Sequence, residues 1–402
     1  MKLLIKAKKV VIKLIQFIYH MTYRLIPVDD KTMLFLSFHG RGYSDNPKAI
    51  YEQMRKDERL KDYRFIWVIK NYKQKNIQIE GAKIINYLSP AYFYYLSRAK
   101  YWIFNCKMPA YIAKKSNQIY LQTWHGTPLK RLGHDIHVDK DTTFYRSKLS
   151  AQEMYETYDI DVARYNYMIS PNSFCTKVFQ SAFAIDRARL IETGYPRNDI
   201  LTNATLKEIC DIKKRLGIPN DKKVLLYAPT WRDNQYVTKG YTFKLEANFK
   251  KWKEMLADEY VVVFKPHYLI INETANDESL KDFVFNIDAN EDISSLYLIA
   301  DALVTDYSSV FFDYAILNRP IYFYMYDIES YKDELRGFYI DIYKDLPGKI
   351  YDREDDLLKA IKLEDYDYKK LVEFNELFNE HEDGKASKRV VETVLTGATS
   401  WD

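Results

Sequence analysis

Short apolar runs that are typical of β-strands alternate with amphipathic helical segments along most of the chain. The strand-like runs "MLFLSF" and "YRFIWVIK" flank the helical stretch "NPKAIYEQMRK", for example, and the same alternation returns in the second half. Strands that alternate with helices indicate an α/β fold with a mainly parallel sheet. The hydrophobic pattern therefore predicts that helices and a mainly parallel sheet form the body of the protein.

A polar stretch, "YPRNDILTNATLKEICDIKKRLGIPNDKK", interrupts the pattern and places a domain boundary near residues 200 to 220. We predict four segments: an N-terminal helix (1–27), a first α/β domain (28–205), a second α/β domain (206–375) and a mixed-charge helical tail (376–402), expected to be solvated or to pack back across the domain junction. Two open α/β domains suggest a cleft between them. Ligands bind such sheets beyond the carboxyl ends of the strands, so polar residues at strand ends are the candidates for function.

The N-terminal segment has no acidic residue before Asp29, and its polar residues recur at helical spacing. The basic members of the stripe that face an anionic surface are Lys2, Lys6, Lys9 and Lys13. A basic amphipathic helix in the membrane interface is the favoured interpretation; the alternative is a first helix that packs its apolar side on the body. No segment is long enough to cross a bilayer. The sequence thus predicts a peripheral protein on the cytoplasmic face of the membrane.

Donor groups follow several strands of the second domain. Arg232 follows "LLYAPTW", and Lys265 and His267 follow "YVVVF". A further strand, "ALVT", ends at Thr305, and a helix is expected from near Ser308, with Asp306 or Ser308 as its cap. A strand, a polar turn with Ser308 and Ser309, and a helix N-terminus together favour a phosphate site, although these residues could simply cap a structural helix.

Two further residues extend the candidate site. Asp313 lies one helical turn beyond Ser309 and could accept a hydrogen bond from a sugar hydroxyl, or be a solvated helix residue. His125 follows "YLQTW" at a strand end of the first domain, beside Gly126. An imidazole with its usual pKa near 6.5 suits removal of a proton from a hydroxyl. His125 is therefore a candidate general base, against the alternative of a structural histidine.

The charge and the cysteine content of the chain argue against some classes of function. The formal net charge of +4 is too small to indicate nucleic-acid binding, and no RNA- or DNA-binding motif is present. Cys106, Cys175 and Cys210 are far apart and lack metal-ligand spacing, as expected for a reducing compartment. No acidic cluster resembles a metal site, so we expect neither a metal nor another cofactor.

Five ordered motifs resemble the CDP-glycerol glycerophosphotransferase family of wall teichoic acid synthesis: "TWHGTPLKRLG", "ETGYPRND", "YAPTWRD", "KPHYL" and "DISSLYLIADALVTDYSSVFFDYAILNRPIYFYMYD". The resemblance runs over nearly the whole chain, from "SFHGRGYSDNPKAIYEQM" to "DGKASKR". It implies a GT-B fold, in which two Rossmann-like domains face each other across a cleft. It also implies transfer of glycerol phosphate from CDP-glycerol to the terminal hydroxyl of a membrane lipid-linked teichoic acid precursor, with release of CMP.

The resemblance assigns roles to individual positions. The family's catalytic histidines correspond to His125 and His267. The donor-binding candidates, combined with the strand-end residues, are Arg232, Lys265, Thr305, Asp306, Ser308, Ser309 and Asp313. The acceptor-side candidates are Asn105, Trp124, Gly126 and Thr127.

Several alternatives remain open at the level of sequence. Family polymerases often carry an additional N-terminal domain, which favours a primase-like enzyme here. The donor could be CDP-ribitol, or the chain could be a GT-B glycosyltransferase that uses a nucleotide sugar. A non-catalytic membrane-bound module that binds anionic polymers is a third reading, and nucleic-acid binding is the least favoured. The sequence predicts no oligomeric state.

Overall fold

The computed structural model describes most of the chain, namely residues 2–136, 149–230, 236–237, 240–241, 246–265, 277–288, 291–328 and 337–397. For residues 2–10, 151, 236–237 and 240–241, only the backbone is described. Two compact units make up the protein. The N-terminal unit consists of Met1–His125, Leu132–Asp199 and Lys385–Asp402, and the C-terminal unit consists of Gly126–Arg131 and Ile200–Gly384.

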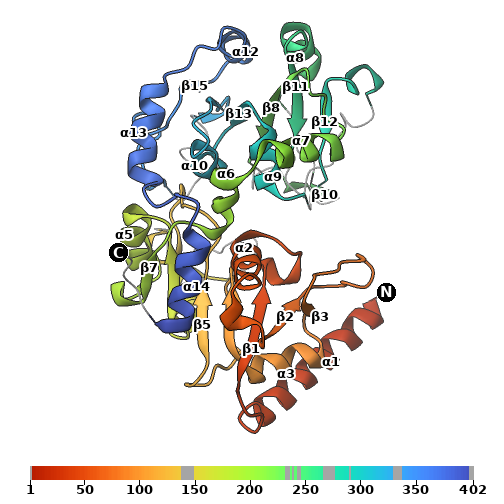
Figure 1. The fold of residues 1–402 in the computed structure, drawn as a ribbon, viewed down its shortest axis with the longest axis vertical. Helices are drawn as coiled ribbons and strands as arrows, with labels where there is room; N and C mark the ends of the chain where they lie inside the picture. The colour runs from red at the N-terminus through yellow and green to blue at the C-terminus, as the bar shows by residue number, and fades with distance from the viewer. Residues whose placement is uncertain are drawn as a thin grey trace. The chain divides into compact units, whose positions relative to one another are not determined.

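A seven-stranded sheet forms the centre of the N-terminal unit, with strand order β3-β2-β1-β4-β5-β6-β7 (Figure 1). All neighbouring strands pair in parallel. The strands are β1 (Asp29–Leu36), β2 (Arg64–Val68), β3 (Ala82–Ile85), β4 (Ala99–Phe104), β5 (Ile119–Gln122), β6 (Tyr167–Ser170) and β7 (Leu190–Glu192). Their apolar runs are almost wholly buried, as expected for a parallel sheet with helices on both faces.

The helices of this unit are α1 (Lys2–Thr22), α2 (Asp45–Met54), α3 (Pro90–Arg98), α4 (Ala151–Val162), α5 (Ser173–Ala182) and α14 (Ala386–Thr396). Helices α2 to α5 lie between strands of this sheet along the chain, whereas α1 precedes the first strand and α14 returns from the end of the chain. Short 3₁₀ turns lie at Phe38–Gly40 (η1), Glu58–Leu60 (η2), Gly133–Asp135 (η3), Arg187–Arg189 (η4) and Pro196–Asn198 (η5). Side-chain caps fix several helix starts: Ser89 caps α3, Ser150 forms a capping box with Glu153, and Asn172 caps α5.

The C-terminal helix α14 is part of the core of the N-terminal unit. Val390, Val391 and Val394 pack in the same apolar cluster as the strands of the first sheet. Both carboxylate oxygens of Asp199 accept hydrogen bonds from the first backbone N–H groups of α14, at 2.9 Å from Ala386 N and 2.8 Å from Ser387 N. The helical prediction for the tail is thus confirmed, whereas α14 is buried rather than solvated.

The C-terminal unit contains a six-stranded parallel sheet with order β12-β11-β8-β13-β14-β15. Its strands are β8 (Lys223–Ala228), β11 (Tyr260–Phe264), β12 (Val284–Asn286), β13 (Ala302–Thr305), β14 (Ile321–Tyr324) and β15 (Ile350–Tyr351). The two-residue strands β9 (Tyr236–Val237) and β10 (Gly240–Tyr241) form an antiparallel pair. The helices are α6 (Asp199–Asn203, which enters from the first unit), α7 (Leu206–Arg215), α8 (Phe249–Leu256), α9 (Ile293–Ile299), α10 (Val310–Ala315), α12 (Glu354–Lys362) and α13 (Tyr368–Phe378), with a 3₁₀ turn η7 (Glu278–Leu280).

The two sheets share the doubly wound strand order of Rossmann-like folds, which confirms the predicted fold class. Each sheet grows outward from two central strands, and the order reverses between them. These pairs are β1 and β4 in the N-terminal unit and β8 and β13 in the C-terminal unit. The carboxyl ends of the paired strands form the switch points at which open sheets bind ligands.

Helix α1 lies beside α3 on the N-terminal unit (Figure 1). Tyr19 attaches it there: its side chain is buried, contacts the ring of Phe93, and its hydroxyl donates to Ala113 O at 2.7 Å. A continuous apolar face of the same helix is exposed, formed by Val11, Leu14, Phe17, Ile18 and Met21. Among the described residues, the helices are all too short or too polar to span a membrane.

Candidate functional site

His125 ends the first chain segment of the N-terminal unit, three residues after β5. Its Nδ1 lies 2.8 Å from the backbone oxygen of Asn105, which follows β4. Because a carbonyl oxygen can only accept, Nδ1 must carry the hydrogen in this contact. In the neutral ring the second nitrogen, Nε2, then holds the lone pair. His125 is exposed as a whole residue, and Nε2 is the ring nitrogen left for chemistry.

Aromatic rings hold the imidazole on two sides. The indole of Trp124 stacks on it with ring centres 4.4 Å apart, and the ring of Phe38 meets it edge-on at 5.6 Å. Desolvation lowers the pKa of His125 below its usual 6.5, while the charge of Asp45 and the bond to Asn105 oppose this shift and Arg197 adds to it. The lowered pKa keeps the ring neutral, and therefore able to accept a proton, at physiological pH.

A buried carboxylate holds the loop after β4 in place. Asp161, on α4, accepts from Met108 N at 2.9 Å and pairs with Arg164 at 2.8 Å. Arg164 in turn donates to the backbone oxygens of Met108 and Pro109. Burial raises the pKa of Asp161, with Arg164 opposing the shift. This network anchors the loop that supplies the carbonyl partner of His125.

Asn105 itself joins the two loops at the first switch point. Its Oδ1 accepts from Phe38 N, after β1, at 2.8 Å, while its backbone oxygen serves His125. Among the described atoms, its Nδ2 is buried without a hydrogen-bond partner. The structure thus brings two predicted acceptor-side residues of this unit, Asn105 and Trp124, together with the predicted base, His125.

The chain crosses into the C-terminal unit directly after His125. Gly126 and Thr127, both predicted acceptor-side residues, begin a short segment that belongs to that unit. Leu129 O accepts from Tyr339 N at 2.9 Å, and Arg131 N donates to Gly337 O at 3.0 Å. These bonds tie the segment after the base to the second unit's own backbone.

At the second switch point, side chains from the end of β13 form hydrogen bonds with residues at the end of β8. Thr305 is fully buried, and its hydroxyl donates to Ala228 O at 2.8 Å. Asp306 is 2% exposed and accepts from the backbone N–H of Thr230 at 2.8 Å and from the Thr230 hydroxyl. Asp306 therefore orders the start of the segment that leads to Arg232.

The predicted cap of the helix after β13 was wrong. Helix α10 begins at Val310, and its N-cap residue is Ser309, which makes no side-chain cap bond. Asp306 is unsuited to cap because its carboxylate bonds Thr230 instead. Ser308 and Ser309 are half-buried beside the helix start, and Asp313 is buried in its first turn. With six residues, α10 offers a weaker dipole than the sequence suggested.

Lys265 follows β11 and bridges to the loop before α9. Its Nζ donates to Asp288 O at 2.6 Å and to Glu291 O at 3.0 Å. Desolvation lowers the pKa of Lys265, and the nearby charges of Asp288, Glu291 and Asp292 oppose that shift. The ammonium therefore has an ordering role in the loop, whatever else it binds. Arg232 and His267, the other two predicted donor-side cations, lie outside the described residues.

Sequence reasoning missed a polar cluster around His125 that involves Asp45, Asn46 and Arg197. Asp45 and Arg197 form an ion pair at 3.1 Å, and Arg197 Nη1 donates to His125 O at 2.7 Å. Both lie in quoted motifs, "SFHGRGYSDNP" and "ETGYPRND", to which no role had been given. The sequence does contain a signal for this cluster. Asp45 and Arg197 have opposite charges, and each lies in a motif that follows a strand of the same sheet.

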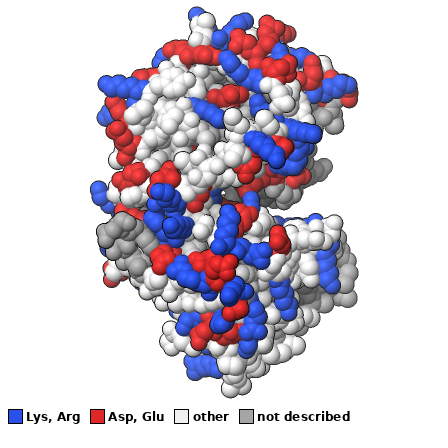
Figure 2. Space-filling view, viewed as in Figure 1, with Lys and Arg blue, Asp and Glu red and all other residues white. Residues whose placement is uncertain are grey.

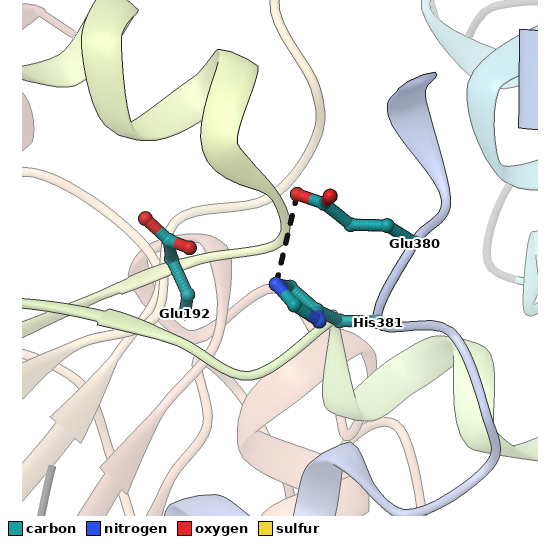
Figure 3. Close-up of side chains that lie close together, drawn as sticks. All are labelled: Glu192, Glu380 and His381. Atoms are coloured by element: carbon teal, nitrogen blue, oxygen red, sulfur yellow. Dashed lines mark ion pairs between the residues drawn. The ribbon is translucent and has the colours of Figure 1, made fainter. Parts of the chain in front are cut away.

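Among the described residues, we assign no further site to charged groups elsewhere. Figure 3 shows Glu380 and His381, after α13, whose carboxylate and imidazole lie 3.6 Å apart. Glu192, drawn with them, belongs to the N-terminal unit, so we build no metal site from the three. On the face seen in Figure 2, basic and acidic side chains are interspersed. That face offers no support for nucleic-acid binding.

Two Rossmann-like units with polar residues at the switch points of their sheets define a GT-B-like α/β protein. The chain belongs to the CDP-Glycerol:Poly(glycerophosphate) glycerophosphotransferase family, whose model matches residues 17–396. This confirms the resemblance inferred from the motifs.

Similar proteins include a teichoic acid glycerol-phosphate transferase and teichoic acid poly(glycerol phosphate) polymerases. The teichoic acid glycerol-phosphate transferase of Staphylococcus aureus is 40% identical over 397 residues, which is 96% of this chain and 99% of that protein. The teichoic acid poly(glycerol phosphate) polymerase of Bacillus subtilis is 40% identical over 96% of this chain. The chain spans about half the length of that polymerase and of its Staphylococcus epidermidis counterpart, 51% and 52%. Ribitol-phosphate enzymes are more distant, at 26 to 28% identity.

Solved structures agree with this grouping. The wall teichoic acid polymerase TagF matches with a TM-score of 0.88 and 38% identity over 98% of this chain and 97% of that one. Structures of TagF include histidine variants, one of them soaked with CDPG. A UDP-GlcNAc 2-epimerase from Neisseria meningitidis matches with a TM-score of 0.51 and 12% identity over 90% of this chain and 99% of that one, which shows likeness of fold alone.

Proposed function

We propose that the protein is a teichoic acid glycerophosphotransferase that moves glycerol phosphate from CDP-glycerol to the terminal hydroxyl of a lipid-linked acceptor and releases CMP. The observation that carries the proposal is the 40% identity to a teichoic acid glycerol-phosphate transferase over 99% of its length. The geometry of His125 supports it, because the ring presents a basic nitrogen at a strand end.

In this reaction the acceptor oxygen forms a bond to the glycerol-bearing phosphorus as the bond to CMP breaks. The bonding electron pair leaves with CMP, and the hydroxyl proton passes to Nε2 of His125. CMP is a good leaving group, so positioning and charge stabilisation supply most of the catalysis. We assign donor binding to the second switch point, with Arg232, His267, Lys265, Ser308 and Ser309 as the groups that neutralise the diphosphate.

A CMP-release assay tests the proposal. CDP-glycerol and CDP-ribitol are offered separately to a synthetic lipid-linked disaccharide, with and without one glycerol phosphate attached, and product masses are measured. Release with CDP-glycerol supports the proposal, and the masses give the number of units added. Release with CDP-ribitol alone would move the donor to ribitol, and no release with either would contradict the transferase function.

We further propose that the protein binds the cytoplasmic face of the membrane peripherally through α1. Five exposed apolar side chains of α1 lie on one face of the helix, and Phe17 and Leu14 are 64% and 56% exposed. Lys13, His20 and Arg24 are exposed alongside them. An exposed apolar face with a basic border is typical of a helix that lies in an anionic interface.

The double variant Leu14→Ser/Phe17→Ser should bind phosphatidylglycerol vesicles roughly tenfold or more weakly, because it removes two side chains worth about 1.5–3 kcal/mol each when fully buried. Sedimentation with vesicles measures this. Val372→Ser/Leu377→Ser on α13 is the matched control, since these residues are 51% and 52% exposed. Equal losses in both variants, or none in α1, would contradict the proposal.

A further inference from the structure

A buried amide side chain, that of Asn46, holds the backbone that leads to His125. Asn46, the second residue of α2, is fully buried. Its Nδ2 donates to Thr123 O at 3.1 Å and to Trp124 O at 3.2 Å, and its Oδ1 accepts from Arg197 N at 3.1 Å. Asn46 thereby joins α2, the turn η5 and the strand end that precedes the base.

This amide stabilises an unusual backbone. Trp124 has φ +50°, a left-handed conformation that is unfavourable for a residue with a Cβ. Besides the bond from Asn46, the N–H of Trp124 donates to Gln122 Oε1 at 3.0 Å. Since the indole stacks on the imidazole, the orientation of the base depends on this conformation being kept.

Arg197 links the same peptide to a carboxylate. Its Nη1 donates to His125 O at 2.7 Å and lies 3.1 Å from Asp45 Oδ2. The side chains of Arg197 and Asp45 are only 12% and 7% exposed. In such surroundings solvent screens charges weakly, so both act strongly on the nearby ring.

We propose that Asp45 is the counter-charge of His125: it stabilises the imidazolium that forms when the base takes the acceptor proton, and Arg197 holds it in place. Asp45 and Arg197 are thus positioning residues. The proton enters at Nε2, because Nδ1–H stays bonded to Asn105 O. The proposal rests on the proposed role of His125 as general base in the transferase.

The signs of the surrounding charges support this assignment. The charge of Asp45 raises the pKa of His125, and that of Arg197 lowers it. His39, in η1, also interacts with His125, and Arg41 and Lys107 act on His39 in turn. Among these groups Asp45 carries the negative charge, so it is the group able to stabilise positive charge on the ring.

The experiment is an NMR titration of the imidazole C–H signals of the full chain, which has seven histidines. His125→Gln identifies the His125 signal. Asp45→Asn should lower the proton affinity of His125 about threefold to tenfold, and Arg197→Gln should raise it by a similar factor, because one pKa unit is a tenfold change. A purely structural role would not shift the two variants in opposite directions.

Kinetics and conservative variants complete the test. Asp45→Asn should lower kcat about tenfold to a hundredfold with little change in KM for CDP-glycerol, and Arg197→Lys, which keeps the charge, should titrate like the wild type. If Arg197→Gln does not fold, Asp45→Asn and Arg197→Lys carry the test. Asp57→Asn is the control, because Asp57 pairs with Arg59 on the surface of the same unit.

The outcomes separate the two proposals. An unchanged titration of His125 in folded Asp45→Asn would overturn the counter-charge. The expected shifts in a protein that, as wild type, transfers nothing from CDP-glycerol would uphold the charge pair and contradict the proposed function. Shifts together with a lower kcat support both.

Discussion

The two sheets have the same strand order but use their switch points differently. In the N-terminal unit, buried groups such as Asn46 and Asp161 fix loops so that one side chain, His125, is displayed with a basic nitrogen. In the C-terminal unit, two polar residues at the end of β13, Thr305 and Asp306, are themselves buried and bonded to residues at the end of β8. The first switch point presents a reactive group, whereas the described part of the second is a framework.

This difference indicates that the two switch points have different roles. A general base must be reachable and must hold one tautomer, and both conditions are met by a ring bonded at one nitrogen only. A diphosphate site needs donors at fixed positions, which a rigid strand-end framework provides. Substitutions in the two places should therefore fail in different ways, and the predictions below use that contrast.

The largest effect is expected for His125→Gln. Loss of a general base lowers kcat by about 10²–10⁴-fold, while binding of CDP-glycerol should be retained because donor binding is assigned to the other unit. Single-turnover CMP release and equilibrium binding of CDP-glycerol measure the two quantities. His134→Gln is the control, since His134 pairs with Asp159 at 2.7 Å on the same unit. Substantial residual turnover in His125→Gln would remove the base assignment.

An intermediate effect is expected for Asp306→Ala. Removing the carboxylate leaves the Thr230 N–H without its bond, which should cost about 1–3 kcal/mol of stability. It should also weaken CDP-glycerol binding, because Thr230 lies at the switch point to which donor binding is assigned. Chemical denaturation and donor titration measure these.

Asp301→Ala is the matched control for that variant. Asp301 accepts from Val224 N at 2.7 Å, so it bonds the same strand, β8, at the opposite end. It should lower stability without changing donor affinity. If both variants weaken donor binding equally, the second switch point is not the donor site.

Much of this architecture could be predicted from sequence because it depends on local patterns. Buried apolar runs identified the strands, and the polar stretch after Tyr195 marked a change of domain. His125 could be selected as a candidate because it stands at a strand end beside Gly126. The parts that were missed depend on long-range contacts: Asp45 and Arg197 are 152 residues apart in the chain. Nothing local to either residue shows that they meet.

A wrong prediction and an open one have the same origin. Asp306 has the sequence context of a helix cap, yet a bond to Thr230, 76 residues away, takes its carboxylate. The mixed-charge sequence of helix α14 left two alternatives, a solvated tail or one that packs back across the domain junction. The structure shows the second, because its valines complete the core of a unit whose other elements lie almost 200 residues earlier. The amphipathic helices at the two ends of the chain thus differ: α1 keeps its apolar face exposed, whereas α14 buries its own apolar face.

The smallest effect is a pH dependence of stability that only the first switch point should show. Desolvation lowers the pKa of folded His125 below 6.5, so the unfolded chain binds a proton first as the pH falls. Unfolding then takes up a proton, and the free energy of unfolding decreases as the pH drops below about 6.5 until the folded pKa is passed. Denaturation of wild type and His125→Gln between pH 7.5 and roughly pH 5 should therefore show the steeper loss in the wild type. Asp306→Ala, which leaves this histidine intact, should keep the wild-type slope. Parallel curves for wild type and His125→Gln would show that the folded protein does not lower the pKa of His125. The two switch points would then not differ in their electrostatics.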